Sequence, residues 1–145
     1  MASRSDSSFP AYIEAVISRF GFLLAEGYDR PRISVRDREC AIVYWGRNKP
    51  IIAIYHDMGG PPYVEVVPLD YLRGDGSVRS YGLAEAMPIL TPVHDGPPEL
   101  SERWYHRLSA ICPWLDWYAA FLQTHVQAII HPSCEFLDAI ERRRI

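Results

Sequence analysis

The sequence contains no long hydrophobic run. No apolar stretch approaches the roughly 18 to 20 residues that are needed to cross a bilayer. The first ten residues, MASRSDSSFP, lack the apolar core of a secretory signal. We therefore expect a cytoplasmic protein that makes no contact with a membrane.

Cysteine is scarce, with three residues at positions 40, 112 and 134. An odd number of widely spaced cysteines does not suit a disulfide framework. Free cysteine usually behaves as a small buried hydrophobe. We expect reduced thiols in the core, which agrees with a cytoplasmic location.

Motifs for catalysis and for metal binding are also missing. The chain has no G-x-S-x-G nucleophile motif and no C-x-x-C or H-x-x-x-H pair. Its glycine-rich segment at residues 58–62 leads towards a strand, whereas a phosphate-binding loop leads into a helix. We therefore expect no catalytic residue, no cofactor and no metal, and the sequence favours a protein that is not an enzyme.

The composition is that of a folded protein. With 145 residues, 48% of them hydrophobic and 12% aromatic, the chain is long enough to bury one core and too short to expect two domains. We expect a single domain over residues 1–145, in which the small polar residues 1–7 form a disordered tail.

Residues 32–68 predict an antiparallel β-meander of four strands. Apolar side chains recur at helical spacing from Phe9 to Phe20, which predicts an N-terminal helix, and residues 22–24 are expected to form an extended connector. Short β-branched and aromatic runs separated by turn residues then predict the strands. Their expected bounds are Arg32–Arg36, Cys40–Trp45, Ile51–Tyr55 and Tyr63–Val67.

The C-terminal half has helical patterns, so the predicted fold class is α+β, with these helices packed on the sheet. We expect a short helix at residues 82–90, further helices at residues 99–111 and from Pro113 to residue 130, and a last helix capped by Ser133. The second and third strands carry apolar residues on both faces. This pattern predicts a sheet covered by helices on both sides.

Charge is distributed unevenly along the chain, although the net charge is only −3. Residues 30–49 contain six basic residues against Asp37 and Glu39, whereas residues 57–102 contain eight acidic residues against Arg73 and Arg79. An acidic middle segment attracts basic partners, although scattered carboxylates are also common on ordinary protein surfaces.

The order of elements gives a resemblance. A helix ending in Phe20-Gly21-Phe22, followed by AIVYWGRNKPIIAIYHD and YVEVVP as successive strands and then by helices, resembles the small α+β immunity proteins of bacterial polymorphic and contact-dependent toxin systems. The resemblance implies a non-catalytic protein that binds and neutralises a toxin domain. If that partner is basic, its contacts are expected at the acidic side chains of the middle segment, namely Asp57, Glu65, Asp70, Asp75, Asp95, Glu99 and Glu102.

Other functions compatible with the sequence come from different classes. A small metal- or ligand-binding enzyme would need a pocket between the sheet and the C-terminal helices, and it would use His106, His125 or His131. Nucleic-acid binding would start from the basic residues near Trp45, but a pI near 5.9 counts against it. A homodimer is compatible with everything in the sequence.

Overall fold

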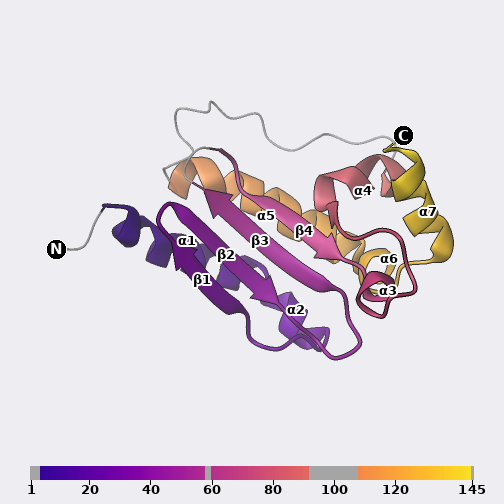
Figure 1. Ribbon diagram of the computed structural model, residues 1–145. Helices are drawn as coiled ribbons and strands as arrows, with labels where there is room; N and C mark the ends of the chain where they lie inside the picture. The colour runs from indigo at the N-terminus through magenta and orange to yellow at the C-terminus, as the bar shows by residue number, and fades with distance from the viewer. Residues whose placement is uncertain (1–3, 58–59, 92–107, 145) are drawn as a thin grey trace.

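The computed structural model describes residues 4–57, 60–91 and 108–144. The fold is α+β, as predicted, with an N-terminal helix, an antiparallel sheet and C-terminal helices (Figure 1). In chain order the elements are α1 (Arg4–Arg19), α2 (Phe22–Ala25), β1 (Arg32–Arg36), β2 (Glu39–Tyr44), β3 (Ile51–Asp57), β4 (Tyr63–Val67), α3 (Leu69–Leu72), β5 (Tyr81–Gly82), α4 (Leu83–Leu90), α5 (Leu108–Thr124), α6 (Val126–Ile130) and α7 (Cys134–Arg142).

The sheet is a meander with the strand order β1-β2-β3-β4-β5, and every pair of neighbours is antiparallel. The bounds of β1 and β4 are those predicted from the sequence. The tight turn between β1 and β2 has a positive φ of 49° at Asp37, a conformation that aspartate adopts more readily than most residues. The sequence missed β5, because a strand of two residues has no detectable periodicity.

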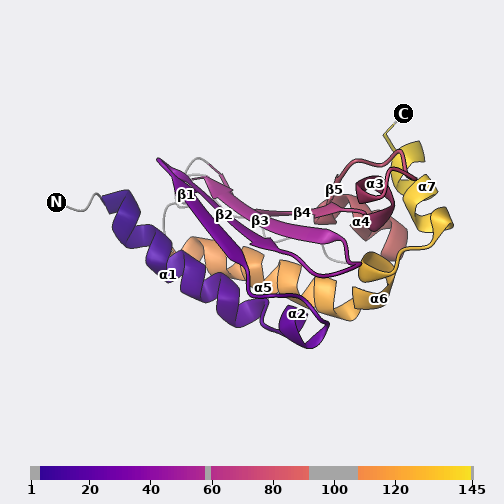
Figure 2. The ribbon, with the colours of Figure 1, turned by 60° about the horizontal axis from the view of Figure 1, so that its bottom comes forward.

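The helices α1 and α5 lie side by side against the same face of the sheet (Figures 1 and 2). No helix in the described part of the chain lies over the opposite face of β1, β2 and β3. The described helices therefore do not give the two-sided cover that the sequence predicted. We call the uncovered side the open face of the sheet.

Alternation along the strands assigns each side chain to one face. The buried positions of the central strands alternate in sequence and point towards the helices. They form the core together with buried residues of α1, α4, α5 and α7. The side chains of this face in β2, β3 and β4 are Cys40, Ile42, Tyr44, Ile52, Ile54, His56, Val64 and Val66.

An apolar residue on the open face does not require a helix above it. Ala53 is 2% exposed because it is small and lies between the larger side chains of Val43 and Glu65, its partners on the neighbouring strands. This local shielding explains why apolar residues on both sides of β3 misled the sequence-based prediction.

Several helix boundaries also differ from the predictions. Helix α1 begins at Arg4, within the expected tail, and Phe22–Ala25 is a short helix where an extended connector was predicted. Pro113 lies inside α5, where it was expected to begin a new helix. The helix predicted for residues 99–111 lies mostly outside the described residues.

The predicted cap of the last helix is confirmed. The Ser133 hydroxyl oxygen accepts a hydrogen bond of 3.1 Å from the Phe136 backbone N–H, at the start of α7. No helix in the described part of the chain is long and apolar enough to cross a bilayer.

Candidate functional site on the open face of the sheet

The strand register places two rows of side chains across one end of the open face. The first row runs from β1 to β4 through Ser34, Ala41, Tyr55 and Tyr63, which are successive cross-strand partners. The second row crosses β1, β2 and β3 through Arg36, Glu39 and Asp57. Two small residues therefore lie beside two large aromatic ones, with charged side chains along one margin.

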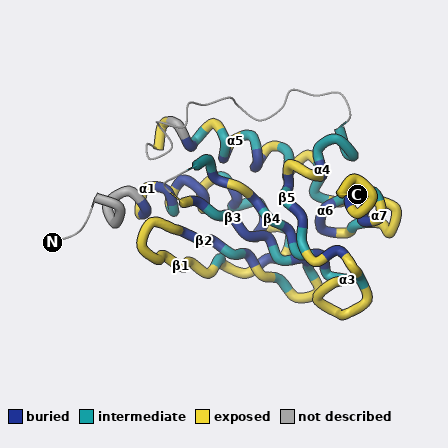
Figure 3. Tube along the Cα trace, turned by 45° about the horizontal axis from the view of Figure 1, so that its top comes forward, coloured by how far each residue is buried: buried dark blue, intermediate teal, exposed yellow. Residues whose placement is uncertain are grey.

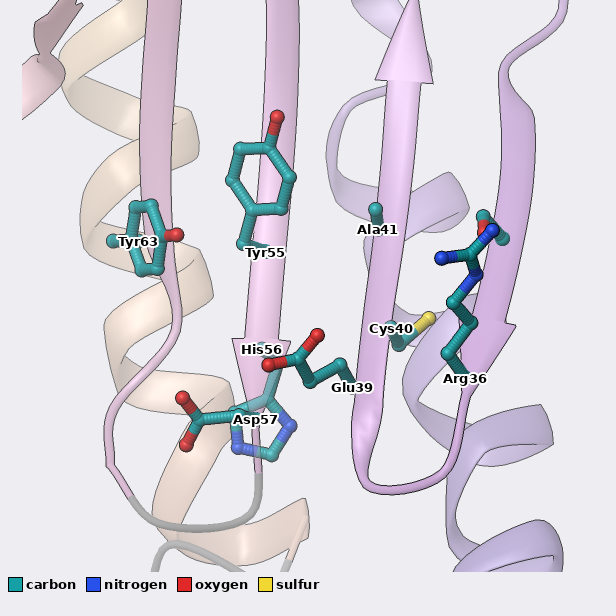
Figure 4. Close-up of a pocket in the computed structure, with 9 residues that line it drawn as sticks. Arg36, Glu39, Cys40, Ala41, Tyr55, His56, Asp57 and Tyr63 are labelled. Carbon is teal, nitrogen blue, oxygen red and sulfur yellow. The ribbon is translucent and has the colours of Figure 1, made fainter.

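A pocket of about 230 Å³ occupies this end of the open face (Figure 4). It forms because the side chains of Ser34 and Ala41 are short and leave space on this face. The two tyrosines and the charged residues of the second row enclose that space. The pocket is lined by Ser34, Arg36, Glu39, Cys40, Ala41, Tyr55, His56, Asp57 and Tyr63.

The aromatic wall of the pocket consists of Tyr55 and Tyr63. Their rings stack with centroids 5.1 Å apart and planes 29° apart, and Tyr63 is 48% exposed. Exposed aromatic rings of this size are typical anchors of protein interfaces. Held against each other, the rings lose little side-chain freedom when a partner binds.

Carboxylates surround the aromatic wall. Partial burial first, and then the nearby charges of Glu65, Asp57 and Glu39, raise the pKa of Tyr63 above its ordinary value. In Figure 4 the Glu39 side chain extends from β2 towards β3, and the Asp57 carboxylate points towards β4. The positively charged side chain of Arg36 lies on the β1 side of the pocket. This end of the face therefore carries a net negative charge.

A buried group lies beneath the pocket, on the helix side of the sheet. Tyr12 of α1 stacks on His56 with centroids 5.0 Å apart and planes 9° apart. Cys40, the cross-strand partner of His56, is 1% exposed, and burial raises the pKa of its thiol to about 11. A thiol with this pKa stays protonated at neutral pH, so Cys40 is unsuited to nucleophilic chemistry.

The seven predicted contact residues do not form one site. Asp57 and Glu65 lie on the open face. Asp70 and Asp75 line a separate hollow of about 160 Å³ beside α7, which also contains Asp138 and Glu141. In that hollow the Ser77 hydroxyl donates to the Glu141 carboxylate at 3.1 Å. The other three, Asp95, Glu99 and Glu102, lie outside the described residues.

The two described histidines of the alternative enzyme hypothesis, His125 and His131, do not line the pocket. His125 is half-buried, and its Nε2 lies 2.9 Å from the Thr91 hydroxyl, with which it shares a hydrogen bond. His131 is exposed after α6, and His106 lies outside the described residues. Within the described ranges no group of three or more His, Cys, Asp or Glu side chains is placed to hold a metal ion.

Sequence reasoning missed Glu39, Tyr55 and Tyr63. Glu39 was counted as a compensating charge within the basic segment, although it follows a two-residue turn that places it opposite Asp57. The available signal was the period of two: Glu39, Tyr55 and Asp57 share the face opposite the predicted core positions. To place these residues side by side from this periodicity, one also needs the strand register. The turn residues Asp37 and Arg38 indicate the register of the first hairpin.

Scans against protein-family models, curated proteins and solved structures find no match for this chain. Its function therefore has to be inferred from the site itself.

Proposed function

We propose that this protein is a non-catalytic binding protein that holds a basic protein partner on the open face of its sheet. The observation that carries the proposal is the stacked pair of half-buried Tyr55 and exposed Tyr63 on the open face, surrounded by the carboxylates of Glu39, Asp57 and Glu65. Aromatic area supplies contact energy, and the carboxylates select a positively charged surface.

The acidic hollow beside α7 is a weaker candidate for the same role. Its lining contains no aromatic side chain, and Glu141 already accepts a hydrogen bond from Ser77. Carboxylates alone change the rate of encounter more than they change affinity. We therefore assign the partner to the open face.

The resemblance to immunity proteins adds the identity of the partner. It implies a bacterial toxin domain that is neutralised in the cytoplasm when this protein covers it. The proposal includes that role, and a basic nuclease domain encoded beside this gene is the partner to test.

The test is to express the chain together with the C-terminal domain of a secreted protein encoded next to it, and to measure growth rescue and association kinetics. We expect rescue, and an association rate that falls steeply between low and physiological salt. The absence of both rescue and association would overturn the proposal.

Paired variants then locate the surface. Glu39→Gln with Asp57→Asn removes two charges from the open face, whereas Asp70→Asn with Asp75→Asn removes two charges from the hollow. We expect the first pair to slow association about tenfold at low salt and the second pair to change it much less. Equal effects of the two pairs would show that only net charge matters. A larger effect of the second pair would move the binding surface to the hollow.

A further inference from the structure

The pocket beside Tyr55 and Tyr63 has the size of one amino-acid side chain. Its volume of about 230 Å³ lies below the roughly 300 to 1,000 Å³ of sites that enclose a cofactor or a drug-sized ligand. It is open on a sheet face that the proposed partner covers. A side chain projecting from that partner is therefore the occupant that the geometry accommodates.

The charges at the margin favour a cation. Glu39 and Asp57 are direct cross-strand partners, so their side chains lie on neighbouring strands at one end of the open face. Glu65 adds a third carboxylate near the Tyr63 ring. Carboxylates gathered in this way attract a positively charged group to the pocket.

The aromatic wall selects among cations. A guanidinium group is planar, so it lies flat on a tyrosine ring while its N–H groups donate in pairs to carboxylates. An ammonium group is compact and more strongly hydrated, which makes it lose more on leaving water. A metal ion is disfavoured, because within the described ranges no three ligating side chains converge.

We infer that the pocket binds a single arginine side chain of the partner, with its guanidinium group on the Tyr55–Tyr63 wall and between the carboxylates of Glu39 and Asp57. This inference rests on the proposed function, since it names the residue type by which a basic partner is recognised. Arg36, on the β1 side, limits the space for a second cation and sets the orientation of the first.

The experiment needs no partner. Isotope-labelled protein is titrated with N-acetylarginine amide, and backbone amide shifts are followed by NMR. N-acetyllysine amide carries the same charge, and N-acetylcitrulline amide has nearly the same shape without a charge. We expect millimolar binding, as a single side chain allows, with shifts centred on residues 34–41 and 55–65. We also expect arginine to bind about fivefold more tightly than lysine, and citrulline not to bind.

Variants identify the two parts of the pocket. Tyr63→Leu removes an aromatic ring from an exposed position, and we expect it to abolish most of the preference for arginine over lysine. Glu39→Gln is expected to weaken both cations equally, and Asp70→Asn, in the separate hollow, is the control that leaves the titration unchanged. Equal binding of arginine and lysine by the unaltered protein, binding of citrulline, or shifts centred on residues 70–78 would each overturn the inference.

Failure of this inference differs from failure of the proposed function. If the chain binds its basic partner but does not prefer arginine, the pocket assignment is wrong and the proposed function stands. If arginine binds as expected while no basic partner associates, the proposed function is wrong and the pocket stands as a site for a guanidinium group from another source.

Discussion

At the scale of single residues, the cysteines differ most clearly in their surroundings. Cys40 is enclosed by the sheet and α1, and burial raises the pKa of its thiol to about 11. Cys134 is exposed at the start of α7. The thiolate is the reactive form, so both burial and the raised pKa protect Cys40 from reagents.

Thiol labelling tests this difference. At pH 8 we expect a disulfide reagent to modify Cys134 at least 100-fold faster than Cys40. The Cys40 side chain is buried, and only a small fraction of its thiol is deprotonated at this pH. Mass spectrometry of quenched samples identifies the modified residue. Cys134→Ser should abolish the fast phase, and denaturant should make Cys40 reactive. Equal rates for the two residues in the folded protein would contradict the burial of Cys40.

At the scale of elements, β1 is an edge strand, and all five of its residues are exposed (Figure 3). Ile33 and Val35 are 45% and 44% exposed on its helix-facing side. An edge of this kind invites pairing with a second copy. In an antiparallel self-pairing centred on Ser34, however, Arg32 of each copy would lie opposite Arg36 of the other.

We predict that these arginines keep two copies apart, since like charges opposite each other destabilise a strand pair. Arg32→Glu would create two opposite-charge pairs across the same contact, and we expect it to tighten self-association about tenfold. Sedimentation over a range of concentrations measures this change. The double variant Arg32→Glu with Arg36→Glu restores like-charge repulsion across the contact, so its self-association should be as weak as that of the original chain. Unchanged association in the single variant would show that this edge does not control assembly.

The elements differ in how far the sequence determined them. Alternation of Ile33 and Val35 with polar residues was enough to give β1 its bounds. Pro113 was misread as a helix start because proline is most common in the first turn of a helix, whereas here it lies inside α5. The open face could not be predicted, because Ala53 is shielded by its neighbours across the strands rather than by a helix.

The candidate site was partly within reach of the sequence. The acidic residues Asp57 and Glu65 were identified from charge, but charge alone also selected Asp70 and Asp75, which lie in a different hollow. Tyr55 and Tyr63 have no local signal of function. They become a site only through a register that pairs them across two strands.

At the scale of the whole molecule, burial of ionisable groups couples stability to alkaline pH. Burial raises the pKa of Tyr44 and of Tyr118 to about 12, and that of the Cys40 thiol to about 11. These groups bind their protons more tightly in the folded state than in the unfolded state. The stability they contribute is complete below pH 9 and is lost as pH rises through 11 and 12.

We therefore predict that the free energy of unfolding begins to fall at pH 9, where the Cys40 thiol starts to ionise in the unfolded state, and falls faster above pH 10, where the tyrosines ionise as well. The Cys40 contribution should be about 1 kcal/mol by pH 10. Urea unfolding at fixed ionic strength measures it, and Cys40→Ala should flatten the curve between pH 9 and pH 10. A free energy of unfolding that stays constant up to pH 11 would contradict the raised pKa values of these buried groups.

The one-sided arrangement of helices also has a consequence during synthesis. The strands follow one another directly along the chain, so a ribosome releases the complete meander before it releases α5. Until that helix emerges, part of the sheet's apolar underside faces water, which is the kind of surface that chaperones recognise and that aggregates form from. Protein yield in the cell should accordingly depend on how quickly translation proceeds from β5 to the end of α5.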